Sequence, residues 1–476
     1  MSKLSYKPSG PVKTTESFAV PTVDWKLIAK YDTSGPRYTS YPTAPQFTEE
    51  FTAHDLQETI HNANLQLNPP PLSLYFHLPF CESVCFFCGC NVTFTADRSR
   101  PHAYTQTLIQ EMDLVKPLLQ KRQKVHQLHW GGGTPTFFSP DQLNYLGEGI
   151  YQRFSFAENA EIGLEIDPRE TKEEHLKVLS ELGFNRLSMG IQDFDPTVQK
   201  AINRNQPETM TRNIIESARE HGFQSISVDL IYGLPHQSEK TFAKTLEKII
   251  QLNPDRIALF NFAYLPEMIR HQKAIASDAL PSAAEKFAIL RRAITRFGEA
   301  GYRYIGMDHF AKPHDTLCQA QDQGTLSRNF QGYTTHGDCD LYAFGVSAIS
   351  QIQNVYAQNQ KNIHDYTKAL ANHQFATQRG IRLTPDDLLR REIIMTLMCH
   401  FSLDIQAIEK KYHILFADYF SEELKALSPF EKDELIRLSH NIIQITSTGR
   451  LLVRNLCMIF DAYLKQKPTQ KFSRTI

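Results

Sequence analysis

From residue 72 onward, short apolar runs alternate with longer amphipathic stretches. The apolar runs predict strands at residues 72–80, 125–130, 161–166, 186–191, 225–231, 256–264 and 302–307. The amphipathic stretches predict helices at residues 140–154, 172–182, 210–221, 239–252 and 283–300. Strands that alternate with helices favour a parallel sheet with right-handed crossovers. Six or seven such units predict an α/β fold with a partial or full (β/α) barrel, while periodicity alone leaves a doubly wound sheet open.

The rhythm stops at about residue 365, and we expect a small second domain from there to residue 476. Its predicted elements are helices at 383–403, 405–412, 416–427 and 451–464 and a strand at 441–446. This order predicts a mainly helical, winged-helix-like domain. Its acidic and basic residues are mixed, which favours a lid or packing role over nucleic-acid reading. We expect the basic end, residues 465–474, to be a solvated tail.

The chain before residue 71 divides into two parts. Residues 1–22 are rich in Ser, Thr, Lys and Pro and predict a disordered extension. Residues 23–70 predict an N-terminal arm, because the segment 34–43 combines two tyrosines and an arginine with prolines, which an exposed linker does not need. The alternative is a surface Ω-loop stapled by its own tyrosines. The barrel domain then spans residues 71–364.

Charge and hydropathy exclude several classes of protein. Lys and Arg number 51 and Asp and Glu 52, so a net charge of −1 offers no electrostatic footprint for nucleic acid or an anionic membrane. No apolar run approaches the ~18 residues of a membrane span, and the N-terminus lacks the apolar core of a signal peptide. We therefore expect a protein of the reducing cytoplasm.

Four of the eight cysteines lie between Cys81 and Cys90. Cys81, Cys85 and Cys88 have the spacing C-x3-C-x2-C, which can place three thiolates around one corner of a [4Fe–4S] cluster and leave one iron open. Cys90 follows Cys88 too closely to reach a fourth corner easily. A zinc knuckle would need a second C-x2-C or His pair downstream, and a disulfide is disfavoured in a large chain without an export signal. The scattered cysteines are expected to be ordinary buried residues: Cys318, Cys339, Cys399 and Cys457.

Polar and glycine residues gather at or just past the ends of the predicted strands. They are Cys81–Cys88, Gly131–Thr134, Glu165, Asp167, Gln192, Asp229, Asp308 and His309. In β/α barrels the carboxyl ends of the strands form the catalytic face. The pattern therefore predicts one pocket, with the cysteine triad at its rim.

Two of these groups suggest how a ligand is held. The Gly131–Gly133 run lets backbone approach a ligand where a Cβ would clash, although tight turns also use such runs. Glu165 and Asp167 should share a face while their strand stays regular, and a carboxylate there could hold ribose hydroxyls or an amino group. Burial of this pair against Arg169 or Arg186 is an equally good interpretation.

The cysteine spacing, with Phe87 before the third cysteine, matches the radical S-adenosylmethionine signature, and the Gly-Gly-Gly-Thr-Pro run resembles the methionine-contacting motif of that superfamily. More closely, the chain resembles the oxygen-independent coproporphyrinogen III oxidases (dehydrogenases) of haem biosynthesis. The motifs are residues 34–43 (SGPRYTSYPT), 88–91 (CGCN), 128–136 (LHWGGGTPT), 165–170 (EIDPRE), 183–190 (GFNRLSMG), 229–235 (DLIYGLP), 306–310 (GMDHF) and 328–335 (RNFQGYTT). The resemblance runs from about residue 24 to the C-terminus.

The resemblance implies a radical oxidoreductase. Reductive cleavage of S-adenosylmethionine at the cluster would give a 5′-deoxyadenosyl radical that removes a propionate hydrogen. Loss of CO2 would leave a vinyl group, and two such rounds would convert coproporphyrinogen III to protoporphyrinogen IX. The implied cluster ligands are Cys81, Cys85 and Cys88, with Cys90 an extra cysteine that does not bind the cluster.

The resemblance also implies two bound S-adenosylmethionine molecules. The first would contact Tyr75, Gly132, Glu165 and Ile349. The second would lie near Phe87, Gly133, Thr134, Gln192, Arg204, Asp229 and Ala263. We also place Tyr75 among the catalytic residues.

The substrate carries four propionates, so arginines near the catalytic face are candidate anchors. Arg binds carboxylates in a bidentate fashion, and we hypothesise this role for Arg37 and Arg328, with structural ion pairing as the alternative. A second hypothesis makes the N-terminal arm a lid over the site.

Three rival functions remain. A haem chaperone of the same superfamily typically lacks the arm motif and the Gly-Cys-Asn that follow the cluster ligands, and both are present here. A radical methyltransferase would use the same cofactors, and the balanced charge argues against an iron–sulfur sensor that binds nucleic acid. We expect a monomer served by an electron donor such as a flavodoxin-type reductant, with no nucleic-acid or membrane partner.

Overall fold

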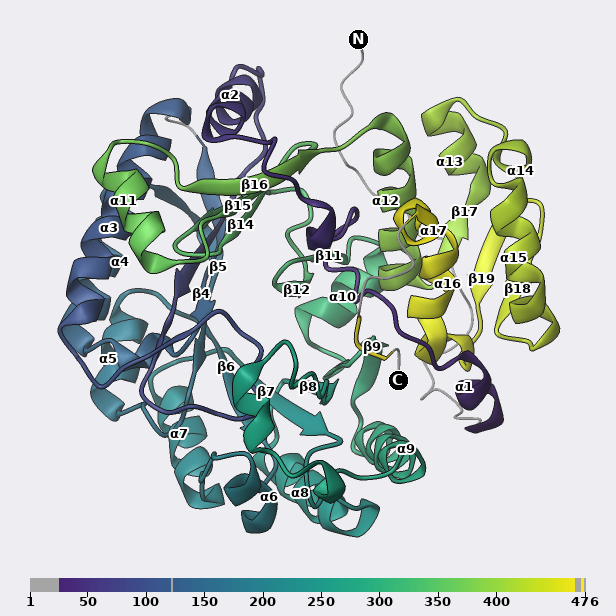
Figure 1. The fold of residues 1–476 in the computed structure, drawn as a ribbon, viewed down its shortest axis with the longest axis horizontal. Helices are drawn as coiled ribbons and strands as arrows, with labels where there is room; N and C mark the ends of the chain where they lie inside the picture. Colours follow the sequence, from purple (N-terminus) through teal and green to yellow (C-terminus); the bar gives the residue numbers. More distant parts are fainter. Residues whose placement is uncertain (1–24, 121–122, 467–471, 475–476) are drawn as a thin grey trace.

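The computed structural model describes residues 25–120, 123–466 and 472–474. The extension predicted at residues 1–22 lies outside the described residues. Figure 1 shows a curved sheet with helices along its outer side and a second, smaller helical domain beside its open end. The main hydrophobic core lies between the sheet and those helices and includes Trp130, Leu164 and Leu246.

A twelve-stranded sheet forms the centre of the fold, in the order β16-β15-β14-β13-β1-β4-β5-β6-β7-β8-β10-β9. Within the described residues, the seven consecutive strands from β13 to β8 are parallel. They are β13 (Asp340–Phe344), β1 (Leu72–Leu78), β4 (Lys124–Gly132), β5 (Ser155–Ile166), β6 (Arg186–Gln192), β7 (Ser225–Tyr232) and β8 (Arg256–Asn261). Because β9 and β16 do not pair with each other, the barrel is partial, as the β/α repeat predicts.

The seventh parallel strand is not the one that the sequence pattern predicts. The run at 302–307 forms β9 (Arg303–Gly306), which joins the sheet through antiparallel β10 (His309–Ala311). The seventh parallel strand is instead β13, which pairs with β1 from the other side. Its five buried residues are not followed by an amphipathic helix, so the β/α rhythm does not reveal it.

Three antiparallel strands extend the sheet beyond β13. They are β14 (Ile349–Ile352), β15 (Val355–Asn359) and β16 (Thr377–Arg382). The boundary predicted at residue 364 divides this sheet, since β16 still pairs with β15. Two small pairs stand apart: β2 (Phe80–Cys81) with β3 (Thr93–Phe94), and β11 (Ser327–Asn329) with β12 (Gly332–Thr334).

All five predicted barrel helices are present. They are α4 (Pro140–Tyr151), α5 (Glu173–Glu181), α7 (Glu208–Glu220), α8 (Glu239–Leu252) and α9 (Ala283–Glu299). In α8 the buried positions Phe242, Leu246 and Ile249 recur at helical spacing, and Ser238 caps the first turn. The pattern did not predict α1 (Trp25–Tyr31), α2 (Ala53–Asn64), α3 (Arg100–Val115), α6 (Pro196–Ala201), α10 (Thr316–Gln323) or α11 (Ile363–Ala371).

The C-terminal domain has its own core, and its elements follow the prediction with smaller breaks. Its helices are α12 (Pro385–His400), α13 (Ile405–Tyr412), α14 (Phe416–Tyr419), α15 (Ser421–Lys432), α16 (Val453–Ile459) and α17 (Ala462–Gln466). A three-stranded antiparallel sheet joins β17 (Ser402–Asp404), β19 (Ile442–Ile445) and β18 (Ile436–Leu438). The single helix predicted at 451–464 is divided at Phe460.

The N-terminal arm packs on the C-terminal domain. Tyr38 and Tyr41 are fully buried in that domain's core, and the Tyr38 hydroxyl donates to Asp461 across 2.9 Å. An Ω-loop stapled by its own tyrosines is therefore wrong. Residues 467–471 of the predicted solvated tail lie outside the described residues; Arg474 is exposed, and its Nε donates to Asp32 across 2.8 Å. No helix in the described ranges has the length and apolar character to cross a bilayer.

Candidate active site

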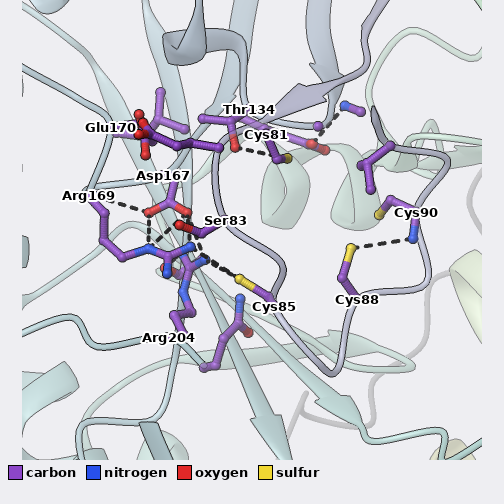
Figure 2. Close-up of a pocket in the computed structure, with 18 of the residues that line it drawn as sticks. Cys81, Ser83, Cys85, Cys88, Cys90, Thr134, Asp167, Arg169, Glu170 and Arg204 are labelled. Atoms are coloured by element: carbon purple, nitrogen blue, oxygen red, sulfur yellow. Dashed lines mark hydrogen bonds and ion pairs between the residues drawn. The ribbon is translucent and has the colours of Figure 1, made fainter. Parts of the chain in front are cut away.

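The three predicted cluster ligands line one cavity. Cys81 is the last residue of β2, and Cys85 and Cys88 lie in the loop between β2 and β3 (Figure 2). This loop follows the carboxyl end of β1 in the chain. A single zinc ion with bonds of about 2.3 Å would need sulfurs about 4 Å apart. Within the described residues, the three thiols do not form a group whose atoms all lie within 4.8 Å. This spacing suits a cluster, in which each thiolate binds a different iron.

Cys85 lies against two guanidinium groups. Arg169 Nη2 donates to Cys85 Sγ across 3.1 Å, and Arg204 Nη1 lies 3.5 Å from the same sulfur (Figure 2). Both arginines also bind Asp167, at 2.7 and 2.9 Å. Burial alone would raise the pKa of Asp167, but the two guanidiniums outweigh it and hold that pKa at about 2. The two guanidinium groups therefore lie next to a sulfur that would be negatively charged as a thiolate.

The thiols of Cys88 and Cys90 share one proton unequally. The Cys90 thiol and backbone N–H donate to Cys88 Sγ, which lowers the pKa of Cys88 to about 6 against the opposing effect of burial. The same contact, followed by burial, raises the pKa of Cys90 well above its usual value. Cys81 is different, since burial raises its pKa to about 12 although Thr134 Oγ1 lies 3.4 Å from its sulfur. Cys88 is thus the thiolate of the pair and Cys90 the thiol.

Glycines are required at positions 132 and 133 because other parts of the chain approach their backbone closely. A Cβ on Gly133 would lie 2.7 Å from Phe80 O and Pro79 C, so any side chain there would push β4 away from the segment that carries Cys81. Gly132 has φ +111°, and a Cβ on it would lie 2.6 Å from the His77 ring. The two glycines therefore let the β4 end and the cysteine loop pack together.

Glu165 and Asp167, predicted to act on one face, have different surroundings. Glu165 makes no contact with Arg169 or Arg186: its carboxylate accepts from Gly132 N–H at 3.2 Å and lies 3.7 Å from His129 Nε2. Desolvation by the surrounding protein would raise the pKa of Glu165, but His129 and the N–H of Gly132 hold that pKa below its usual value. The side chain is 49% exposed, so this carboxylate remains available to a ligand.

The far wall of the cavity carries polar groups from β6 and β7. Gln192 has φ +67°, and its buried Oε1 has no hydrogen-bond partner among the described residues. Burial, together with the charge of Glu165, raises the pKa of Asp229 to about 7, although Arg204 opposes this. Both residues line the cavity, as predicted. An unpaired acceptor and a carboxyl that titrates near neutrality are typical of a site built for a polar ligand.

Most predicted site residues meet at this cavity. Its lining includes Cys81, Cys85, Phe87, Cys88, Gly132, Gly133, Thr134, Glu165, Gln192, Arg204 and Asp229. Tyr75, Ala263 and Ile349 are not among its lining residues. Tyr75 lies on β1, with its ring stacked on His129 at 6.2 Å. Ala263 lines a second cavity of about 540 Å³, and Ile349 packs against a separate apolar cluster that includes Phe47.

The two arginines predicted as anchors differ in their pairing. Arg37 forms an ion pair with Asp308 and lies over the Phe260 ring. Burial and then the charges of Arg454 and Arg328 lower the pKa of Arg37 to about 9. Arg328 is 6% exposed, and its Nε and Nη1 have no hydrogen-bond partner among the described residues.

Sequence reasoning missed several contacts of the site. The pairing of Arg169 and Arg204 with the Cys85 sulfur could not be read from their positions in the chain. His271 was not considered, although its Nε2 lies 2.6 Å from Cys88 O. It comes from a short 3₁₀ segment, Arg270–Ala274, that no periodic pattern marks.

The residues present fit the iron–sulfur cluster that the cysteine spacing indicates and the S-adenosylmethionine that the resemblance implies. Three thiols on one loop suit a cluster with an open iron, and Gly132 and Gly133 bring backbone to the wall of the same cavity. The exposed carboxylate of Glu165 and the unpaired Oε1 of Gln192 are complementary to the amino and hydroxyl groups of a nucleoside ligand.

Comparisons with known proteins agree with this fit. The family model "Radical SAM superfamily" matches residues 75–249, and the model "HemN C-terminal domain" matches residues 383–452. Oxygen-independent coproporphyrinogen III oxidase of Pseudomonas aeruginosa is 49% identical over 96% of this chain and 99% of its own length. Its Escherichia coli counterpart is 48% identical over 96% of this chain and 100% of its own length.

A solved structure is similar over nearly the whole fold. It is described as coproporphyrinogen III oxidase (HemN) from Escherichia coli, a radical SAM enzyme. It covers 94% of this chain and all of its own, with 46% identity and a TM-score of 0.89. Similarity of this extent includes the partial barrel, the arm and the C-terminal domain. The chain therefore belongs to the oxygen-independent coproporphyrinogen III oxidase family, within the radical SAM superfamily.

Proposed function

We propose that this chain catalyses the oxygen-independent oxidative decarboxylation of coproporphyrinogen III, converting two propionates to vinyl groups and giving protoporphyrinogen IX. The observation that carries the proposal is the similarity, over almost the full chain, to proteins named for this reaction. The cavity supports it, because the cysteine triad, the glycine run and the exposed carboxylate line one space.

The chain's own residues have distinct tasks in this reaction. When bound, a [4Fe–4S] cluster and S-adenosylmethionine supply a 5′-deoxyadenosyl radical that can remove a propionate hydrogen. Cys81, Cys85 and Cys88 would hold the cluster, and the guanidiniums beside Cys85 would balance its charge. Glu165 would accept hydrogen bonds from the ribose or amino group, while Gly133 lets the end of β4 pack against the segment that carries Cys81.

A second S-adenosylmethionine molecule belongs to the proposal. Of the seven residues assigned to it, Gln192, Arg204 and Asp229 line the cavity, as do Phe87, Gly133 and Thr134, and Gln192 offers an unpaired acceptor. The number bound can be measured by equilibrium dialysis of cluster-loaded protein. Two molecules per chain are expected, falling to one in Gln192→Ala, and a single molecule in the parent protein would contradict this part.

Arg328 is the stronger candidate for a substrate anchor. A buried guanidinium with two unpartnered nitrogens is costly unless an anion completes it, and a propionate carboxylate has the matching geometry. Arg37 already has a carboxylate partner in Asp308, which favours a positioning role. Arg328→Gln should raise the KM for the substrate by roughly 10-fold or more, while exposed Arg291→Gln on α9 serves as control. An unchanged KM in Arg328→Gln would remove this role.

The test of the function is anaerobic reconstitution, followed by incubation with coproporphyrinogen III, S-adenosylmethionine and a reductant. Both 5′-deoxyadenosine and the vinyl product should accumulate together. Methylated product without CO2 would indicate a methyltransferase, and tight stoichiometric haem binding without decarboxylation would indicate a chaperone. The proposal includes a monomeric, cytoplasmic protein and a flavodoxin-type electron donor, which size-exclusion chromatography and a reductant screen can test.

A further inference from the structure

Two histidines and a cysteine converge at the end of the sheet opposite the cysteine loop. His126, His336 and Cys339 each offer one ligand atom, and these atoms all lie within 4.8 Å of one another. We propose that His126, His336 and Cys339 bind one zinc ion. This site is separate from the cluster site and does not depend on the proposed reaction.

The fold brings these residues together through a β-bulge. Leu72 of β1 pairs with Val125 and the next residue, Ser73, pairs with Gln127, so His126 is the extra residue on β4. The pairing of β4 with β5 skips His126 as well. A bulged residue leaves the regular alternation, and its side chain can be aimed in a new direction.

The other two donors come from the far side of β1. Cys339 directly precedes Asp340, which pairs with Leu72 from the side opposite Val125. His336 lies in the turn before it and is tied to Cys339 by a backbone hydrogen bond of 3.3 Å. The site therefore straddles the start of β1 and would connect β4 with the segment that leads into β13.

The donor set indicates the metal. Two imidazoles and one thiolate are borderline-to-soft ligands that suit zinc, whereas Mg²⁺ and Ca²⁺ require oxygen donors. A single thiol excludes an intrachain disulfide at this place. The fourth position is open to water or to Asp338, whose Oδ1 lies 3.9 Å from Cys339 Sγ.

The two rings are available to a metal. Neither the His126 nor the His336 ring makes a hydrogen bond within the described residues, and both side chains are half-buried. Cys339, expected to be an ordinary buried residue, is half-exposed and sits beside these rings.

The location indicates a structural role. β1 spans seven residues from Leu72 to Leu78, so the zinc site lies about 20 Å from the cysteine loop at about 3.3 Å per residue. At that distance the ion cannot contact the cluster or its ligand. The ion would connect β4 to the segment before β13 at the end of the partial barrel where β1 begins.

Zinc and iron can be measured independently on the cluster-loaded protein. After purification with zinc present and removal of loosely bound metal, elemental analysis should find about one zinc per chain in addition to the iron of the cluster. Absorption at the zinc K-edge, which iron does not disturb, should show one sulfur at about 2.3 Å and nitrogens at about 2.0 Å. A zinc shell without sulfur, or zinc below about one fifth of an equivalent, would overturn the proposal.

Variants separate this site from the cluster cysteines. Cys339→Ser and His336→Gln should each lower the zinc content at least 5-fold with unchanged iron, while Cys318→Ser should keep both metals. Added zinc should raise the Tm of the parent protein and not that of Cys339→Ser. If Cys339→Ser and His336→Gln both kept their zinc, the zinc would be bound at the cluster cysteines and the proposal would be wrong. Decarboxylation is scored separately, so its failure would leave this test intact.

Discussion

The guanidinium of Arg169 donates to the sulfur of Cys85 across 3.1 Å and to the carboxylate of Asp167 across 2.7 Å. One carboxylate thus orients the cations that face a cluster ligand. Because Asp167 is 6% exposed and binds two guanidiniums, its ionisation is linked to the stability of the folded chain.

Asp167→Asn should lower the free energy of unfolding by about 2 kcal/mol at pH 7. This value follows from the difference between the folded-state pKa of Asp167, about 2, and the ordinary value of 3.8. Since this pKa is lowered, the stabilisation is present above pH 4 and is lost as the pH falls toward 2. Urea unfolding at pH 7 and pH 3 checks this, and the difference between parent and variant should shrink at pH 3. Asp113→Asn, which breaks an exposed pair with Arg153, should cost less than ~1 kcal/mol. Equal losses in the two variants would contradict the prediction.

Cys81→Ser, Cys85→Ser and Cys88→Ser should each abolish the cluster, while Cys90→Ser should keep it. The reason is that Cys90 is the protonated partner of the Cys88 thiolate. Iron and sulfide content after anaerobic reconstitution measures this, with Cys318→Ser as a control for loss of a buried cysteine. Loss of iron in Cys90→Ser would show that Cys90 is a ligand.

Gly133→Ala should lower both the Tm and the iron content, because its Cβ would lie 2.7 Å from backbone atoms of Pro79 and Phe80. Overpacking of this kind costs about 1–3 kcal/mol. Gly149→Ala, whose Cβ would meet the flexible side chains of Ile109 at 3.3 Å and Arg153 at 3.9 Å and no backbone, is the matched control on α4. Thermal unfolding and iron analysis of both variants test the prediction, and a parent-like Gly133→Ala would refute it.

The parent protein should lose stability as the pH rises from about 4 to about 7, whereas Asp229→Asn should not, so the difference in stability between the two should change in favour of the variant. Burial and the charge of Glu165 raise the pKa of Asp229 to about 7, so the protonated form stabilises the fold and that contribution is lost across this window. Thermal unfolding at pH 5 and pH 8, before S-adenosylmethionine is added, should show a larger Tm difference at pH 8. Glu165→Gln should move the transition to lower pH. A pH-independent difference would contradict the assignment.

The pattern of the chain predicted the parallel sheet, the five barrel helices and the position of the cysteine triad. These features are local, since they depend on the period of apolar residues and on the distance between neighbouring cysteines. The convergence of Cys81, Gly133, Glu165 and Asp229 also followed, because the carboxyl ends of parallel strands meet at one edge.

The sequence by itself determined the repeat and the cysteine spacing, whereas the tertiary structure decided the pairings. It decided that β13 completes the parallel sheet, that Asp167 is held by arginines while Glu165 stays open, and that His126 leaves the alternation of β4. β5 ends at Ile166, so the period-two rule stops between the two carboxylates. The physical reason is general: periodicity is read from adjacent residues, whereas ion pairs, bulges and strand neighbours arise from contacts between residues far apart in the chain.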